Sequence, residues 1–382
     1  MTGLELFDTS RANRDGLFNR DRLLAAIRAA GLDAVIASTS NNVTYTSGAY
    51  LPSTLLLSTF VVTSADGAQF IVLNEADAYY VRSCSWIKDV RTFGFSPRSD
   101  QEALQLLAQG LSDLGLSGAR LGIEKGSVDL EAMTVAMSHA TLANGSAVFE
   151  KTRQVKTDKE IALFEAAALA TAKAIAACFT LARPGDTEKS LQASMQSAVL
   201  HLGADGLAHA VVHSGVHSTV VHAHSMEVPI RWGEVIHVDF GGNFGGYKTD
   251  LSRNAVVGSP RPRQADIYRK LCEIEEMLFS QIRPGVSAST LFDVGEKAHQ
   301  RAGLKYPWTT IGHSSGLAVH EGFEMSRGTN VDLESGMILQ IEPSHIEDGD
   351  ARYHIEDSVL VTEHGARWLS DFGREPDMFR IE

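Results

Sequence analysis

Five side chains in the second half of the sequence are of types that bind divalent metal ions. They are four carboxylates and one imidazole, each in a short apolar or glycine-rich segment: Asp239, Asp250, His313, Glu342 and Glu356. Four carboxylates in one site would repel each other and hold protons unless cations neutralised them. The residue types therefore predict two divalent ions that share bridging oxygens, as in a dinuclear metallohydrolase.

The spacing of the acids predicts two β-hairpins that each present two carboxylates. Asp239 ends an apolar run and Asp250 follows the turn-rich segment 241–248, so a hairpin would bring the two together. Glu342 ends a second apolar run, and Glu356 lies in the next one, 354–361. A single acid at a strand end is more often a cap or turn residue, but an acid inside an apolar strand is costly without a partner. Together the four acids favour a metal site.

The order of these residues resembles that of the M24 metallopeptidases. Two Asp residues separated by ten residues are followed by Gly-His with a second His seven residues later, then Ile-Glu-Pro and Ile-Glu-Asp. The family includes Xaa-Pro dipeptidases, aminopeptidase P, creatinase and ectoine hydrolase. The resemblance covers nearly the whole chain, because residues 20–50 resemble the family's amino-terminal domain and residues 152–167 resemble the helix that opens its catalytic domain.

The resemblance implies an α+β fold: a pita-bread catalytic domain with an internal pseudo-twofold repeat, preceded by a smaller α/β amino-terminal domain. We place the two domains at residues 1–150 and 151–382. In the second, the Arg-Pro-Gly that ends at Gly185 recurs at Gly285, and the same offset pairs His213 with His313. Two similar helix ends would also explain this pattern, so a duplicated half-domain and a coincidence of helix stops both stay open.

Periodicity predicts alternating helices and strands in the first domain. The expected helices are 21–30, 101–115 and 129–138, and the expected strands are 34–37, 54–62, 69–72, 121–123 and 147–149. This half of the chain carries no cluster of catalytic residue types. We expect it to wall the substrate pocket and to contribute to a homodimer contact.

The resemblance also implies a role for each metal ligand. Asp239 would chelate one ion, Asp250 and Glu356 would bridge the two ions, and His313 with Glu342 would complete the shell of the other. Glu342 would also act in catalysis, by taking the proton of the attacking water and passing it to the leaving nitrogen. Mn²⁺ is the expected metal, and the ligand chemistry leaves Co²⁺, Zn²⁺ and Fe²⁺ open.

Two further histidines correspond to catalytic and substrate-contacting positions of the family. The family places one His seventeen residues before the first metal Asp, which is His222 here, while His224 has weaker support. The second is His320, seven residues after His313. Imidazoles beside a carbonyl can donate hydrogen bonds as negative charge develops on it.

Departures from the family pattern concern the substrate. Prolidases commonly have an Arg two residues before the last metal Glu, where this chain has His354, with Arg352 two residues further back. A histidine cannot reproduce the bidentate grip of Arg on a carboxylate. We expect both residues to contact substrate. Ser314 and Phe323 also replace a Gly and a Pro of the family motif. For Glu321, Glu324 and Arg253, a structural ion pair and a catalytic role both stay open.

The expected activity is hydrolysis of the amide bond on the amino side of proline in Xaa-Pro peptides. The alternative is a non-peptidase amidohydrolase of a small nitrogen compound, as in ectoine hydrolase, because pocket residues rather than the fold set the substrate. A metal-free enzyme of the creatinase kind and a pure binding module are further alternatives. The five intact ligands weigh against both.

Composition excludes several other classes. The net charge of −13 argues against a nucleic-acid partner, since phosphate binding needs a basic surface. Cys84, Cys178 and Cys272 lack CxxC spacing, which argues against disulfides and a thiolate metal site. No apolar run reaches membrane-spanning length, and the first residues lack the pattern of a signal peptide. We therefore expect a cytoplasmic enzyme without a membrane partner.

Overall fold

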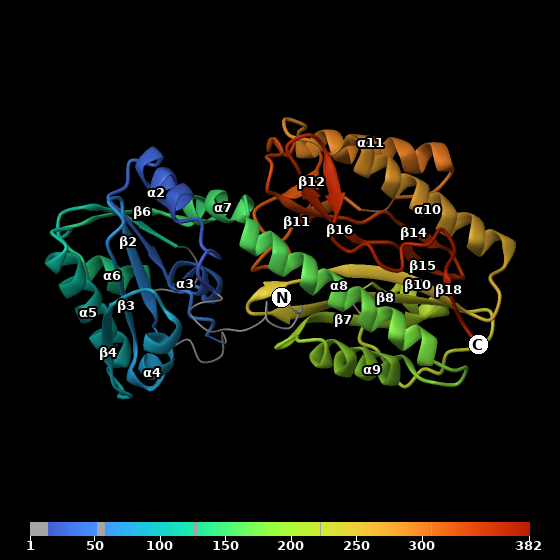
Figure 1. Cartoon of the computed structure of the whole chain (residues 1–382), viewed down its shortest axis with the longest axis horizontal. Helices are drawn as coiled ribbons and strands as arrows, with labels where there is room; N and C mark the ends of the chain where they lie inside the picture. Colours follow the sequence, from blue (N-terminus) through green and yellow to red (C-terminus); the bar gives the residue numbers. More distant parts are fainter. Residues whose placement is uncertain (1–13, 52–57, 125–128, 222, 307) are drawn as a thin grey trace. The chain divides into compact units, whose positions relative to one another are not determined.

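The computed structural model describes residues 14–51, 58–124, 129–221, 223–306 and 308–382. These residues form two compact units, an amino-terminal one that ends at Arg153 and a carboxy-terminal one from Gln154 to Glu382 (Figure 1). Each unit has its own buried cores. All five predicted metal ligands lie in the carboxy-terminal unit.

The amino-terminal unit is a six-stranded mixed sheet with helices, in the strand order β4-β3-β2-β1-β5-β6. Pairs β1–β5, β5–β6 and β3–β4 are parallel, and pairs β1–β2 and β2–β3 are antiparallel. In chain order its elements are α2 (Arg20–Ala29), β1 (Ala34–Ala37), α3 (Ser40–Ser47), β2 (Phe60–Ser64), β3 (Gln69–Asn74), α4 (Glu75–Cys84), β4 (Asp89–Phe93), α5 (Ser99–Asp113), β5 (Arg120–Ile123), α6 (Leu130–Ala136), β6 (Thr141–Asn144) and α7 (Ser146–Gln154).

Most of the predicted elements of this unit are present. The three predicted helices correspond to α2, α5 and α6, and the strands at 34–37, 69–72 and 121–123 correspond to β1, β3 and β5. Residues 54–57 of the predicted strand 54–62 lie outside the described residues, and residues 60–62 of it belong to β2. The strand predicted at 147–149 is wrong, because these residues belong to α7. Val148 and Phe149 are buried on the inner face of that helix, so three apolar residues in a row marked a helix face.

The carboxy-terminal unit contains three β-sheets. The first has the order β18-β10-β8-β7, with β9 beside β8; the second has the order β12-β11-β13-β16-β17; and β14 pairs with β15. In chain order its elements are α8 (Asp158–Leu181), α9 (Glu188–His201), β7 (Gly206–Ser214), the 3₁₀ helix η3 (Gly215–Thr219), β8 (Val235–Phe244), β9 (Tyr247–Lys248), β10 (Leu251–Val257), α10 (Pro262–Gln281), α11 (Ala288–Ala302), β11 (Thr310–Ser314), β12 (Glu324–Ser326), β13 (Ile338–Ile341), β14 (Ser344–Glu347), β15 (Ala351–His354), β16 (Asp357–Val361), β17 (Ala366–Trp368) and β18 (Phe379–Ile381).

The 100-residue repeat seen in the sequence is a repeat of structure. Each copy is a long helix, an Arg-Pro-Gly turn, a second helix and a strand: α8, α9 and β7 in the first copy, and α10, α11 and β11 in the second. The side chains of Thr187 and Ser287 cap α9 and α11 in the same way. Each also forms an isolated β-bridge, to Pro229 and Asp332 respectively. These matching contacts favour a duplicated half-domain over a coincidence of helix ends.

Each copy of the repeat covers its own sheet. Buried residues of α8 and α9 pack with β7, β8 and β10 in one core, and those of α10 and α11 pack with the second sheet in another (Figure 1). By length and composition alone, α8 is the one helix in the described part that could cross a membrane, whereas we expected no such segment. It meets the criterion because it is rich in alanine. More than half of its apolar window is buried, and helices packed in a protein core meet the same criterion.

Candidate metal centre

The first hairpin brings Asp239 and Asp250 together as predicted. Asp239 lies in β8, Asp250 directly precedes β10, and the two strands are antiparallel neighbours with Ser252 opposite Asp239. Oxygen atoms of both carboxylates lie within 4.8 Å of each other and of a nitrogen atom of His209. Two carboxylates at this separation can share a cation.

The second sheet places the other three predicted ligands in a row. Ile341 lies opposite Asp357, so the next residues outward, Glu342 and Glu356, are neighbours. His313 lies opposite Gln340, and its Nε2 atom is 3.4 Å from Glu356 Oε1. A Cβ atom added to Gly312 would lie 2.0 Å from the carbonyl oxygen of Gln340, so only glycine fits directly before His313.

Backbone hydrogen bonds join this row to the first sheet. The N–H of Glu356 donates to Ser252 O at 3.1 Å, and the N–H of Ser252 donates to Glu356 O at 3.2 Å. Ligands from both halves of the repeat therefore meet at one place.

A cavity of about 510 Å³ opens onto all five predicted ligands. Its lining combines metal-binding, polar and apolar residues: His209, Val211, Val221, Asp239, Asp250, Trp308, Thr309, Thr310, His313, Val319, His320, Glu342, Arg352 and Glu356. This volume is in the range of small-molecule sites, which are concave and hold a few converging polar groups.

Burial and mutual repulsion divide the four acids into two pairs. Burial alone would raise the pKa of Asp239 and Asp250, but His209 outweighs it and lowers the pKa of both. Burial and the nearby aspartates raise the pKa of Glu342 to about 7, and burial with Asp250 raises that of Glu356 well above its usual value. The glutamates therefore hold protons that a cation would displace.

The pKa values of the nearby imidazoles also shift in two directions. Burial would lower the pKa of His209 and His313, but the surrounding carboxylates outweigh it and raise both values well above the usual one. Burial and the charge of Arg352 lower the pKa of His354 far below the usual value. The raised pKa values of His209, His313 and the glutamates favour their protonated forms, which offset negative charge that two divalent ions would otherwise neutralise.

Atoms without a hydrogen-bond partner show that this donor set fits a metal. Within the described part of the chain, the buried atoms Glu356 Oε1 and His354 Nε2 have no hydrogen-bond partner. The Nε2 atom of His313 lies 3.6 Å from Asp250 Oδ2 and 3.4 Å from Glu356 Oε1. Ligand atoms about 2.0–2.2 Å from a common ion are separated by about 3.0–3.5 Å. The residues therefore suit divalent cations.

His209 in β7 is the residue that the sequence did not reveal. Its Nε2 atom lies 2.8 Å from Asp239 Oδ1 and 3.0 Å from Asp250 Oδ1. The ring needs the space beside Gly241, where an added Cβ atom would lie 2.9 Å from it and 2.0 Å from the carbonyl oxygen of Thr249. The glycines after Asp239 were the available signal, because they leave room for a side chain from the paired strand.

Of the two predicted catalytic histidines, the structure describes only His320. His222 lies outside the described residues. The ring of His320 stacks on that of His313, with centroids 3.8 Å apart, and its Nδ1 atom is 2.7 Å from Glu324 Oε1. Glu321 instead pairs with Lys156 at 3.2 Å, and both side chains are buried. Glu324 thus orients His320, while Glu321 forms a structural ion pair.

Arg352 and His354 differ in whether they line the cavity. Arg352 lines the cavity, with its guanidinium carbon 5.3 Å from the ring centroid of Trp308. In the described part of the chain its guanidinium forms no ion pair with a carboxylate, and its Nε donates to Ser344 Oγ at 3.4 Å. His354 is 1% exposed and is absent from the cavity lining. Only Arg352 therefore faces the space that a substrate would occupy.

Behind the ligands, Arg253 holds the two sheets together. Its guanidinium donates to Ser252 O at 2.9 Å, to Glu356 O at 3.0 Å and to Asp357 Oδ1 at 2.7 Å. Arg374 donates to the other oxygen of Asp357 at 3.2 Å. Arg253 and Asp357 are both buried, so Arg253 forms a structural ion pair that fixes the backbone of Glu356.

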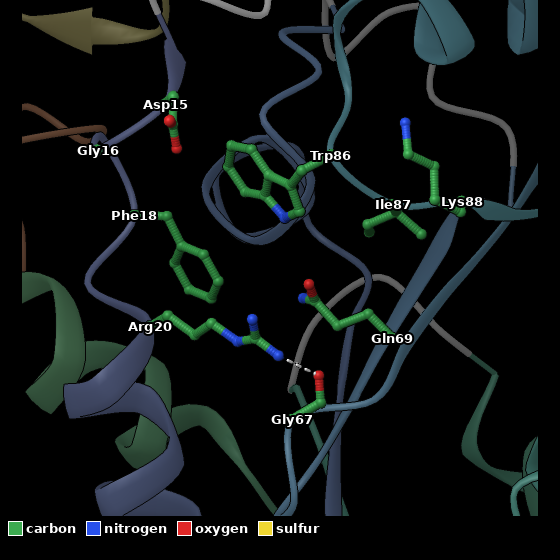
Figure 2. A pocket seen from close by; sticks show the side chains of 9 residues that line it. All are labelled: Asp15, Gly16, Phe18, Arg20, Gly67, Gln69, Trp86, Ile87 and Lys88. Carbon is green, nitrogen blue, oxygen red and sulfur yellow. Dashed lines mark hydrogen bonds between the residues drawn. The ribbon is translucent and has the colours of Figure 1, made fainter.

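A second cavity, of about 430 Å³, lies in the amino-terminal unit. Figure 2 shows Arg20 donating to the carbonyl oxygen of Gly67 beside the rings of Phe18 and Trp86, which stack with centroids 5.5 Å apart. None of the candidate metal-binding groups found among the described residues lines this cavity. The catalytic residue types are gathered in the carboxy-terminal unit.

Comparisons with known proteins agree with this geometry. The chain is 27% identical over 355 residues to an uncharacterized peptidase, YqhT, of Bacillus subtilis, which covers 90% of this chain and 95% of that one. It is 30% identical over 230 residues to an Xaa-Pro dipeptidase of Pyrococcus furiosus, covering 60% of this chain and 66% of that protein.

Solved structures show the same fold along nearly the whole chain. An X-Pro aminopeptidase of Thermotoga maritima matches with a TM-score of 0.83 at 21% identity, covering 95% of this chain and all of that one. A dipeptidase, PepE, of Mycobacterium ulcerans matches with a TM-score of 0.80 at 26% identity, covering 98% and 99%.

Family models match both parts of the chain. The model of the creatinase/prolidase amino-terminal domain matches residues 19–155. The model of metallopeptidase family M24 matches residues 162–363, more than half of the chain. The fold is therefore the pita-bread fold expected from the sequence, and the chain belongs to the metallopeptidase family M24.

Proposed function

We propose that the chain is a dinuclear metal-dependent hydrolase that cleaves the amide bond on the amino side of proline in Xaa-Pro peptides. The observation that carries this proposal is the convergence of Asp239, Asp250, His313, Glu342 and Glu356 on one cavity. Relatives named Xaa-Pro dipeptidase, such as that of P. furiosus, support the choice of substrate.

The residues of the cavity have the properties that this reaction needs. Two divalent ions, when bound by the five ligands, would supply a nucleophilic water at neutral pH and polarise the scissile carbonyl. Glu342 lines the cavity, so its carboxylate is placed to accept a proton from the attacking water and to return it later to the leaving nitrogen.

His320 is the second catalytic group in the proposal. Its ring lies against that of His313 at the cavity, and Glu324 holds its Nδ1 side, so Nε2 is the nitrogen that can donate toward a substrate oxygen. We assign His222 a similar role by its place in the sequence alone.

Arg352 is the residue that we expect to bind the carboxylate of a dipeptide. Its guanidinium is buried at the cavity and has no carboxylate partner within ion-pair distance in the described part of the chain. A buried cation of this kind is costly unless an anion joins it. The free carboxylate of an Xaa-Pro dipeptide would be that anion, held by two parallel hydrogen bonds.

One observation favours the amidohydrolase alternative. His354, at the position where prolidases commonly have an Arg, is buried outside the cavity lining, so it offers a substrate carboxylate no contact. A small amide with different anchoring needs would fit such a pocket as well as a dipeptide.

A substrate panel tests both functions. The metal-loaded enzyme should be offered Xaa-Pro dipeptides, the same dipeptides with amidated carboxyl termini, longer Xaa-Pro peptides, creatine and ectoine. We expect hydrolysis of Xaa-Pro substrates. Arg352→Met should lower kcat/KM for the free dipeptide by about tenfold to a hundredfold, the worth of one charge-assisted bidentate contact, and leave the amidated one nearly unchanged. Hydrolysis of ectoine or creatine without any Xaa-Pro cleavage would replace the peptidase by the amidohydrolase.

A homodimer and a cytoplasmic location remain predictions. Light scattering of the purified protein tests the first. The metal also remains a prediction, with Mn²⁺ proposed, and elemental analysis of the protein as isolated identifies it.

A further inference from the structure

His354 ends β15 two residues before Glu356 and is fixed from several sides. Its backbone N–H donates to Asn254 Oδ1 at 2.8 Å, and its carbonyl oxygen accepts from Ser252 Oγ at 3.4 Å. Only 1% of the residue is exposed. These contacts hold the imidazole beside the ligand cluster, and the residue does not line the cavity.

The Nε2 atom of this imidazole points at two of the predicted ligands. It lies 3.6 Å from Glu342 Oε2 and 3.8 Å from Glu356 Oε2, and it has no hydrogen-bond partner among the described residues. His313, a predicted ligand, approaches its own carboxylate neighbours at 3.4 and 3.6 Å. The two imidazoles thus flank Glu356 at similar distances. A movement of a few tenths of an ångström would bring His354 to the separation of ligands on one ion, about 3.0–3.5 Å.

The other ring nitrogen of His354 faces a second buried histidine. His354 Nδ1 lies 3.3 Å from His237 Nε2, and the two rings are 25° from parallel. His237 is fully buried in β8, two residues before Asp239. An imidazole that binds a metal through one nitrogen carries its proton on the other and donates it to a neighbouring acceptor. His237 Nε2 is placed to accept that proton, which leaves His354 Nε2 with a free lone pair.

From this arrangement we infer that His354 is a sixth protein ligand of the metal centre. It binds through Nε2 to the ion shared by Glu342 and Glu356, and His237 is the positioning residue that holds its tautomer. This inference rests on the proposed dinuclear function. It replaces the substrate contact expected at this position by a metal contact, and it leaves Arg352 as the carboxylate-binding residue.

A second imidazole ligand changes the metal preference of the site. With His313 and His354, the ion at this site has two nitrogen ligands instead of one. Imidazole ligands suit Zn²⁺, Fe²⁺ and Co²⁺, whereas carboxylate and water ligands suit Mn²⁺. The site with His354 should therefore bind Co²⁺ or Zn²⁺ more tightly, relative to Mn²⁺, than the site without it.

The test is a titration of the metal-free full-length protein with Co²⁺, followed by calorimetry and by the visible absorption of the bound ion. The variants are His354→Gln, His237→Leu and, as a matched control, His299→Gln, which changes a buried histidine in α11 outside the candidate metal-binding groups. Urea unfolding of each variant shows whether it is folded.

We expect the wild type to bind two Co²⁺ ions per chain. His354→Gln should weaken one binding step by more than about a hundredfold and change the spectrum of that step alone. His237→Leu should weaken the same step by about tenfold to a hundredfold, the usual effect of removing an outer hydrogen-bond partner of a ligand. His299→Gln should behave as the wild type.

Two results would overturn different parts of the reasoning. If the wild type and His354→Gln bind two ions with equal affinity and equal spectra while KM rises in the variant, His354 contacts substrate and the ligand assignment fails. Should His354→Gln not fold, unchanged Co²⁺ binding by His237→Leu refutes the assignment instead. A wild type that binds fewer than two ions defeats the dinuclear function itself.

Discussion

Removal of the Arg253 side chain should destabilise the carboxy-terminal unit and weaken metal binding together. The buried guanidinium spans β10 and β16 and donates to the backbone carbonyls of Ser252 and Glu356 and to the carboxylate of Asp357. Arg253→Met would leave Asp357 buried and only partly compensated by Arg374 and Ser370. Breaking a buried ion pair by removing one partner costs about 3–5 kcal/mol, and the remaining partners place this case near about 3 kcal/mol.

This loss corresponds to a measurable change in melting temperature. For a unit of 150–250 residues, about 3 kcal/mol lowers Tm by about 6–12 °C. The assay is differential scanning calorimetry of the metal-free protein, because bound ions would add their own stabilisation. In the metal-loaded protein, the looser backbone at Glu356 should weaken divalent-ion binding by about tenfold to a hundredfold, like the loss of other supports of a ligand.

Two further variants complete this experiment: one is a control, and the other tests the ion pair itself. Arg263→Met breaks a half-exposed pair with Glu347 and should change stability by less than about 1 kcal/mol. The double variant Arg253→Met/Asp357→Asn should be more stable than Arg253→Met, because it leaves no uncompensated charge. If Arg253→Met unfolds at the wild-type temperature, or if the double variant is the less stable of the two, the ion pair does not hold the sheets as argued.

Three other predictions concern the metal centre directly. Asp250→Ala should lose both metal occupancy and activity, because this carboxylate is proposed to bridge the ions; elemental analysis that finds two ions in the folded variant would contradict it. His320→Ala should keep its metal content but lose about two to four orders of magnitude in kcat, the usual scale for positioned acid–base and oxyanion groups. Divalent-ion affinity should rise as pH increases through about 7, because Glu342 has a pKa raised to about 7 and must lose its proton before it can bind a cation. Calorimetry at pH 6 and pH 8 in buffers of different ionisation enthalpy measures this proton release, which should shrink in Glu342→Gln.

The positions of the five ligands could be predicted because they depend on local geometry. Antiparallel strands joined through a short segment must lie side by side, so an acid at the end of each strand reaches the same place. This reasoning placed Asp239 beside Asp250. Glu342 and Glu356 are neighbours as predicted, but β13 and β16 pair across an intervening hairpin formed by β14 and β15. The 100-residue repeat could be recognised in the sequence for a similar reason, because Pro and Gly residues end a helix locally.

The other site residues depend on contacts that the sequence does not carry. His209 lies thirty residues before Asp239, and it reaches the aspartates only through the pairing of β7 with β8, whose register shifts between Leu207 and His209. A shift of one residue would have turned this side chain away. The burial of His354 likewise follows from packing between β15 and the strands behind it. The short apolar run at Val148 was misread because three residues do not define a period.

The distribution of ligands over the two halves of the repeat determines the order in which the centre can assemble. Asp239 and Asp250 come from the first half, and His313, Glu342 and Glu356 come from the second. Neither half alone holds a complete set. Both halves must therefore be folded and packed together before two ions can be captured. Once captured, the ions would cross-link segments more than a hundred residues apart, adding to the Arg253–Asp357 ion pair and the backbone hydrogen bonds that already join the two halves.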